Sequence, residues 1–301
     1  MMRLNLILIV ACWGFGVQAQ LLVDIKSLSS TEMQGRETGS PGAARARNYI
    51  ADRYAKLQLG AFNAVYQQPF TYGFQQKKTG VNLVGYLRGC TYPEHYVVVT
   101  AHYDHLGTQG RTVFHGADDN ASGVAAMLEL AARLSDNCPV YSYLLVATDA
   151  EENGLFGAKA FVDSPPVPLS NIVLNVNLDM IAHPDRRGKL YLTGANRYPA
   201  LIAQLKPELT PLKFLHHRGP ARKLRDRQRY DWPNASDHGP FYRAGIPYLF
   251  FGGQVHRYYH TPDDTWQRLD PQFVQLAMQA IWQTVQWIEL QPPTALRPES
   301  S

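Results

Sequence analysis

The chain of 301 residues has little cysteine, little net charge and, after its first twenty residues, no long apolar run. It contains three cysteines, and its formal net charge is +4 at pH 7. So weak a charge gives no argument for nucleic-acid binding, which needs a concentrated basic surface. No later stretch reaches the length of a membrane-spanning helix. We therefore expect a mature chain that does not insert stably into membranes. Its positive charge is concentrated in residues 216–229, which we interpret as a solvated loop or as a rim that attracts acidic substrates.

Residues 1–19 have the features of a secretory signal. Arg3 gives a positive start, residues 4–10 form an apolar core, and residues 17–19 are a small-residue cleavage site. We expect cleavage after Ala19 and export to the periplasm or the medium. Residues 9–12 also resemble a bacterial lipoprotein cleavage box ending at Cys12, but that box would lie unusually close to the start.

Loss of Cys12 with the signal leaves Cys90 and Cys138 in the mature chain. Each precedes an apolar run that reads as a strand, at 96–101 and at 141–147. Two cysteines in an exported protein are candidates for a disulfide. If the two strands are parallel neighbours, both cysteines lie at one edge of the sheet, opposite the candidate site. We predict that they are bonded.

Short β-branched runs that are apolar throughout alternate with amphipathic segments, which indicates an α/β fold with a sheet covered on both faces. We expect a single domain over residues 20–291 and a flexible tail over 292–301. The expected strands are 61–74, 81–87, 96–101, 141–147, 171–179, 190–192 and 246–251, and the expected helices are 43–59, 122–134, 155–162, 199–205 and 270–288.

Acidic and histidine side chains follow several of these strands. In open α/β sheets, ligands bind beyond the carboxyl ends of the strands, and His102, Glu151 and Asp179 each fall at or just after such an end. Imidazole and carboxylate together favour zinc over calcium or magnesium. Five candidate ligands are too many for one open tetrahedral site, but they suit two ions that share a carboxylate. These candidates are His102, Asp118, Glu152, Asp179 and His260.

The adjacent pair Glu151 and Glu152 cannot easily do one job, because neighbouring side chains diverge. One can bind metal while the other acts as a general base. Asp104 lies two residues after His102, on the same side of an extended chain, where its carboxylate can orient the imidazole. The residues alone leave open which glutamate does which.

Six ordered motifs resemble those of the di-zinc aminopeptidase family of metallopeptidase clan MH, which includes secreted bacterial leucyl aminopeptidases and plasma glutamate carboxypeptidase. The resemblance covers residues 31 to 290 and implies a three-layer α/β/α fold with a mixed, mostly parallel sheet of about eight strands. The motifs are AHYDHLG (101–107), GADDNASG (116–123), DAEENGLFG (149–157), NLDM (177–180), SDHGPF (236–241) and HTPDDT (260–265).

The resemblance also implies a role for each candidate. Asp118 would bridge two zinc ions, Glu152 and His260 would complete one zinc site, and His102 and Asp179 would complete the other. Glu151 would be the general base and acid, with Asp104 in support. Ser236, Asp237 and His238 would line the site without chemical roles. The implied enzyme is an exported aminopeptidase that releases residues from peptides with a free N-terminus, using a hydroxide that bridges the ions.

Three other functions fit the same residues. A carboxypeptidase or dipeptidase can use the same metal centre, and a glutaminyl cyclase is an acyltransferase of the same fold that works with one zinc. A binding ectodomain without activity is the third, although intact Glu151 and five intact ligands count against it. Residues 183–235 are the least typical of the family, so side-chain preference is left open, as are the physiological substrate, the native metal and the oligomeric state.

Overall fold

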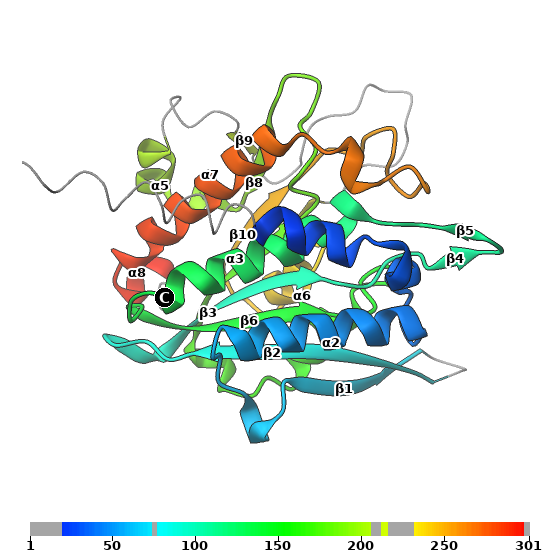
Figure 1. The fold of residues 1–301 in the computed structure, drawn as a ribbon. Helices are drawn as coiled ribbons and strands as arrows, with labels where there is room; N and C mark the ends of the chain where they lie inside the picture. Colours follow the sequence, from blue (N-terminus) through cyan, green and yellow to red (C-terminus); the bar gives the residue numbers. More distant parts are fainter. Residues whose placement is uncertain (1–19, 74–76, 206–211, 216–231, 298–301) are drawn as a thin grey trace, which may run out of the picture.

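Eight strands pair in the order β1-β2-β6-β3-β7-β10-β8-β9 to form the central sheet (Figure 1). The computed structural model describes residues 20–73, 77–205, 212–215 and 232–297. A separate two-stranded sheet pairs β4 (Thr108–Gln109) with β5 (Thr112–Val113). The strands of the central sheet are β1 (Gln67–Tyr72), β2 (Lys78–Leu87), β6 (Tyr141–Thr148), β3 (Tyr92–His102), β7 (Ile172–Asp179), β10 (Tyr248–Gly252), β8 (Leu190–Thr193) and β9 (Leu212–Leu215).

Four parallel strands form the middle of this sheet. β6, β3, β7 and β10 run in the same direction, whereas β1 pairs antiparallel with β2, β2 with β6 and β8 with β10. β6, β7 and β10 are buried throughout, and β3 is buried from Tyr96 onward, as expected for a sheet covered on both faces. Their carboxyl ends, at His102, Thr148, Asp179 and Gly252, therefore lie along one edge.

The alternation of side chains along each strand builds one hydrophobic core on either face. In β3, Val97 and Val99 join the larger core, and Val98 joins the smaller one. Helices α2 (Pro41–Lys56), α3 (Gly123–Ser135) and α7 (Pro271–Glu289) cover the larger core, which lies in front in Figure 1. Helices α4 (Phe156–Asp163) and α6 (His238–Arg243) cover the other. The three-layer α/β/α fold and its mixed sheet are confirmed.

The remaining elements are short. Residues 20–28 are helical and join the larger core through Leu21, Ile25 and Leu28. Helices α5 (Pro199–Gln204) and α8 (Pro293–Leu296) also bury a leucine in that core. The other turns are η1 (Thr31–Arg36), η2 (Phe62–Ala64), the π-turn η3 (Ala117–Ser122), η4 (Leu169–Asn171), η5 (Ala195–Arg197), η6 (Trp232–Asn234) and η7 (Trp266–Arg268).

Two expectations need correction. The strand expected at 61–74 is only β1, because residues 62–64 form a turn with Asn63 at a φ of 53°. Residues 292–297, expected to belong to a loose tail, pack against the domain. Leu296 is fully buried, and Arg297 donates hydrogen bonds to the carbonyl oxygens of Leu169 and Ile172. Apolar burial therefore extends the domain beyond residue 291.

The remaining expectations concern the disulfide, the export signal, the basic segment and membrane insertion. Cys90 and Cys138 form a disulfide with a Cα–Cα distance of 5.8 Å. They precede the parallel neighbours β3 and β6, so the bond lies at the edge opposite the carboxyl ends, as predicted. The expected signal (1–19) and basic segment (216–229) lie outside the described residues. Within the described ranges, no helix combines the length and the apolar composition needed to cross a bilayer.

Candidate metal centre

His102 is the last residue of β3, and its ring is almost completely buried. Its Nε2 atom lies 3.3 Å from Asp119 Oδ1 and 3.3 Å from Asp179 Oδ1. The opposite nitrogen, Nδ1, lies 3.2 Å from the carbonyl oxygen of Asp104 and can donate to it. A proton on Nδ1 leaves the Nε2 lone pair free for a metal ion, the usual arrangement of a histidine ligand.

Asp104 supports the site in a different way from the one expected. Its backbone carbonyl, rather than its carboxylate, makes the close contact with His102; the nearest carboxylate oxygen is 3.7 Å from Nδ1. The carboxylate instead accepts hydrogen bonds from the backbone N–H groups of Glu151 at 3.1 Å and Glu152 at 3.2 Å. Asp104 therefore fixes the turn that follows β6, and with it the directions of both glutamates.

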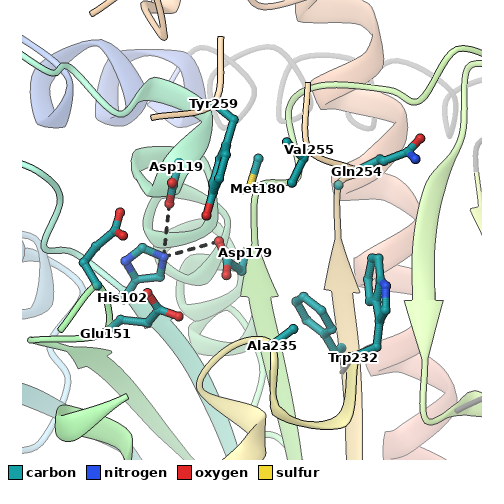
Figure 2. Close-up of a pocket in the computed structure, with 13 residues that line it drawn as sticks. His102, Asp119, Glu151, Asp179, Met180, Trp232, Ala235, Gln254, Val255 and Tyr259 are labelled. Carbon is teal, nitrogen blue, oxygen red and sulfur yellow. Dashed lines mark hydrogen bonds and ion pairs between the residues drawn. The ribbon is translucent and has the colours of Figure 1, made fainter. Parts of the chain in front are cut away.

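Asp119 is the carboxylate shared by the two halves of the site. Its Oδ1 contacts His102 as described, and its Oδ2 lies 3.2 Å from His260 Nε2. Glu152 Oε2 is 3.1 Å from the same His260 nitrogen. Burial would raise the pKa of Asp119, but hydrogen bonds with His102 and His260 outweigh it and hold that pKa well below its usual range. Figure 2 shows Asp119 and Asp179 converging on His102.

Asp118, the expected bridging residue, faces away from this cluster. Its Oδ1 accepts the backbone N–H of Ala182 at 2.7 Å, and its Oδ2 lies 3.1 Å from His256 Nε2. His256 accepts the N–H of Tyr258 on its other ring nitrogen, so its proton is on Nε2 and is donated to Asp118. The carboxylate of Asp118 is thus fully used in holding the loop. The structure therefore places Asp119, rather than the expected Asp118, against His102 and His260.

Asp264 supports the same loop. Its carboxylate accepts the backbone N–H groups of Asp118 at 3.0 Å and Asp119 at 3.1 Å. These two bonds fix the backbone between the adjacent aspartates, so that one side chain faces His102 and the other faces His256. The loop is a π-turn, and extended side-chain alternation does not apply to it.

Glu151 and Glu152 have separate surroundings, as predicted. Glu152 is paired with histidine at both oxygens: Oε1 lies 2.9 Å from His105 Nδ1, and Oε2 contacts His260. Glu151 faces the other half of the site, where it groups with His102 and Asp179. Burial and the charge of Asp179 raise the pKa of Glu151 well above its usual range, against the opposing effect of His102.

The donor set fits divalent cations. Carboxylates of Asp119, Glu151, Glu152 and Asp179 converge on one small volume, where their mutual repulsion is weakly screened. Burial would lower the pKa of His260, but hydrogen bonds to Asp119 and Glu152 raise it to about 10. A field that holds protons this strongly also favours divalent cations, and the mixed imidazole and carboxylate donors suit zinc.

The cavity in front of this cluster has one acidic wall and one apolar wall. His102, Asp119, Glu151, Glu152 and Asp179 form the acidic wall. Figure 2 shows the apolar side chains gathered on the other side, with Tyr259 overhanging the cavity and its hydroxyl pointing inward. The apolar wall consists of Met180, Trp232, Ala235, Phe250 and Val255.

Ser236, Asp237 and His238 lie behind this apolar wall, not at its surface, and all three are fully buried. Ser236 accepts a hydrogen bond from Asn177 at 2.8 Å, and His238 Nε2 lies 2.6 Å from the carbonyl oxygen of Trp232. The His238 ring also stacks on Phe250 with a centroid distance of 4.3 Å. These residues therefore hold the wall in place.

Sequence reasoning missed Asp119, His105 and Tyr259. Asp119 and His105 were inside the quoted motifs, each beside a residue that was chosen, and Tyr259 directly precedes His260. The repeated Asp and the second His of these motifs were the available signals, but spacing alone does not say which member faces the site.

A mixed sheet with paired acid and histidine groups at its carboxyl edge is typical of zinc-dependent enzymes of the metallopeptidase class. More specifically, the chain belongs to peptidase family M28, whose family description matches residues 82–285. It is therefore a metallopeptidase-family hydrolase, and peptides are its class of substrate.

Its relatives carry two different activities in their names. The chain is 27% identical to a glutaminyl-peptide cyclotransferase of Boiga irregularis over 271 residues, covering 78% of this chain and 72% of the relative. It is 30% identical to aminopeptidase YwaD of Bacillus subtilis (strain 168) over 214 residues, covering 66% of this chain but 43% of the relative. The solved structure of BSAP, a zinc aminopeptidase from Bacillus subtilis, matches with a TM-score of 0.70 and 19% identity, covering 92% of this chain and 97% of the other.

Proposed function

We propose that this protein is a two-zinc aminopeptidase that releases N-terminal residues with apolar side chains. The observation that carries the proposal is Asp119, whose two oxygens contact His102 and His260, each of which has a further carboxylate of its own. We assign Asp119, Glu152 and His260 to one ion and His102, Asp119 and Asp179 to the other. Asp119 takes the bridging role that the sequence had given to Asp118.

Bound zinc would polarise the scissile carbonyl group and make a water molecule more acidic. The chain supplies the proton transfer. Glu151 lies beside His102 and Asp179 at the cavity surface, and its raised pKa suits a group that accepts a proton and then releases it. In the proposed reaction it takes the proton from water and delivers it to the nitrogen of the leaving amine.

The charge of the cavity supports a free amino terminus as the group recognised. Its acidic wall attracts an ammonium group, whereas a carboxypeptidase needs a cation to bind the terminal carboxylate. Among the described residues that line the cavity there is no arginine or lysine. The lack of a cation among these residues weighs against a carboxypeptidase that binds substrate through them.

The second donor set supports hydrolysis over cyclisation. A one-zinc cyclase needs only one of the two donor sets for metal, yet both sets are complete here, and Nδ1 of His102 is placed to donate to a backbone carbonyl, which leaves Nε2 free to coordinate. Side-chain preference follows from the opposite wall, where Trp232 and Phe250 provide an apolar surface for the first side chain of the substrate.

We also propose that the protein acts outside the cytoplasm. Residues 1–19 have the composition of an export signal. The bond between Cys90 and Cys138 is of the kind that persists in oxidising compartments.

A peptide panel tests the proposal. Zinc-loaded protein is incubated with tripeptides beginning with Phe, Leu, Lys, Asp or Gln, each with a free or an acetylated N-terminus, and products are identified by mass spectrometry. We expect release of the first residue from free peptides, fastest for Phe and Leu, and no cleavage of acetylated ones. Release of the last residue from acetylated peptides would establish a carboxypeptidase. Loss of ammonia from Gln peptides without hydrolysis would establish a cyclase.

A further inference from the structure

We infer that His105 is a positioning residue that holds the carboxylate of Glu152 through its Nδ1–H and so sets zinc affinity in the half of the centre that contains His260. The inference rests on the proposed metal centre. It adds a residue that none of the roles above includes, and it concerns the binding of zinc before any substrate is present.

The two oxygens of Glu152 have different partners. Oε1 is 2.9 Å from His105 Nδ1, and Oε2 is 3.1 Å from His260 Nε2. The same His105 nitrogen is 3.8 Å from Asp119 Oδ2, too far for a good hydrogen bond. His105 is therefore directed at Glu152, and its bond leaves Oε2 as the oxygen available to an ion held with His260.

The surroundings of the His105 ring fix its tautomer. The residue is 2% exposed, and its Nε2 atom is enclosed without a hydrogen-bond partner among the described residues. A proton on Nε2 would be a buried donor with nothing to accept it, which is costly. The neutral ring therefore carries its proton on Nδ1, where Glu152 accepts it. A protonated Nδ1 cannot itself bind zinc.

Backbone packing keeps this ring in place. A Cβ atom on Gly116 would lie 2.6 Å from His105 Cδ2, so only a glycine leaves space for the imidazole. Gly116 also has a φ of 56°, a conformation that other residues rarely adopt. On another side, the rings of His105 and His260 meet edge to face with centroids 5.8 Å apart. Gly116 and Asp119 belong to the same motif. That motif therefore supplies the shared carboxylate, and it also leaves the space for the His105 ring that holds Glu152.

Loss of this bond should act mainly on metal affinity. Hydrogen-bond partners of metal ligands typically change affinity by about 10- to 100-fold when removed, because the freed ligand samples other orientations. We expect that range for one of the two zinc ions and little change for the ion held by His102 and Asp179.

Two variants separate the hydrogen bond from the bulk of the ring. Asn places an amide N–H near the position of Nδ1, so His105→Asn should bind zinc within about threefold of the wild type. His105→Leu removes the donor at similar volume and should weaken one site by about 10- to 100-fold. Zinc affinity is measured by chelator competition, without substrate. His115→Leu is the matched control, because His115 contacts the carbonyl oxygen of Ser29 at 2.9 Å in the same segment but does not contact Glu152.

The spectrum of cobalt-substituted protein distinguishes positioning from direct ligation. If His105 only positions Glu152, the absorption bands of His105→Asn keep the intensity of the wild type. Loss of a nitrogen ligand from the spectrum, or two unchanged zinc affinities in folded His105→Leu, would overturn the inference. Nitrogen NMR of the zinc-loaded wild-type protein needs no variant: protonated Nδ1 supports the inference, and protonated Nε2 or a metal-bound ring contradicts it.

These outcomes are independent of the reaction catalysed. A protein that binds one ion at Glu152 and His260 and cyclises glutamine would still show the effect of His105 on that ion. Conversely, if the protein is an aminopeptidase, unchanged zinc affinities in His105→Leu would still contradict the role of His105.

Discussion

At the scale of single residues, the two members of each adjacent acidic pair point in different directions, because hydrogen bonds fix the backbone that carries them. Asp264 and Asp104 each accept two backbone N–H groups and so fix the loops of Asp118–Asp119 and Glu151–Glu152. In each pair the side chains then meet different partners. Spacing predicted that Glu151 and Glu152 differ, but the roles given to the aspartates needed the geometry of a turn that has no regular period.

Replacing each aspartate by asparagine compares the two directly. Asp119→Asn removes the shared charge, and we expect zinc affinity to fall by at least 100-fold. Asp118→Asn should lose stability, about 1–3 kcal/mol, because it weakens bonds to Ala182 and His256. Its zinc content at saturation should stay at the wild-type level. Metal analysis after dialysis, with denaturant unfolding in parallel, measures both. Loss of zinc from folded Asp118→Asn alone would restore the original assignment.

Glu151→Gln tests the proton-transfer role. The change keeps the shape of the side chain and removes the base, so kcat should fall by about 10²- to 10⁴-fold. Zinc content should not fall, because neither proposed ion depends on Glu151. Steady-state kinetics and metal analysis are made on the same sample. A variant with wild-type kcat would show that another group moves the proton.

At the scale of elements, the site residues meet at the edge of the sheet where β3, β6 and β7 end. Arg36 connects the loops beyond that edge through hydrogen bonds. Its guanidinium is almost fully buried and donates to the carbonyl oxygens of Leu28, Tyr103, His115 and Gly116 at 2.6–2.9 Å. Burial lowers the pKa of Arg36 to about 10, and the charge of Asp119 and other acids opposes that effect. Residues 35–42 resemble the usual entry segment of the family, but no role for Arg36 followed from the sequence, because its partners are backbone atoms 8 to 80 positions away.

Arg36→Lys should destabilise the protein by about 3 kcal/mol or more, because an ammonium group cannot serve so many buried acceptors. Zinc affinity should fall with stability, since the same bonds hold the segments of His102 and Asp119. Arg45→Lys is the control: its half-buried side chain donates to a single carbonyl oxygen, that of Glu32, and we expect a loss below about 1 kcal/mol. Equal unfolding midpoints for the two variants would contradict this account.

Strands and helices were the part of the fold that the sequence predicted best. The runs at 96–101, 141–147 and 171–179 are mostly apolar, and each contains β-branched residues. The first two lie inside observed strands, and the third begins one residue before β7. The helix α6 and the strand β9 were not expected, because six and four residues are too short to show a period. The order of the strands in the sheet was not predicted from the sequence.

At the scale of the whole molecule, the disulfide and the metal centre lie at opposite edges of one sheet. The bond closes a loop of 48 residues and joins the segments that enter β3 and β6. Its removal should therefore act on the unfolded chain and leave the carboxyl edge intact. The prediction from the sequence succeeded here because the two strands are parallel neighbours, which places both cysteines at the same edge.

The double variant Cys90→Ser, Cys138→Ser should lose about 4 kcal/mol of unfolding free energy, from the entropy of a loop of that length. The kcat of the zinc-loaded protein should stay within twofold of the wild type. Denaturant unfolding and peptide hydrolysis measure the two effects. An unchanged unfolding free energy would show that the bond does not constrain the unfolded chain, and a large loss of kcat would show coupling between the two edges.

The fold alone does not decide the activity, because peptidases and glutaminyl cyclases share it, with TM-scores of 0.70 and 0.71 to this chain. The number of ions decides it more directly. Diffraction from zinc-loaded crystals at the zinc absorption edge locates each ion without reference to any assay. We predict two anomalous peaks on either side of Asp119, one beside His102 and Asp179 and the other beside Glu152 and His260. A single peak beside Glu152 and His260 at saturating zinc would contradict the two-zinc centre.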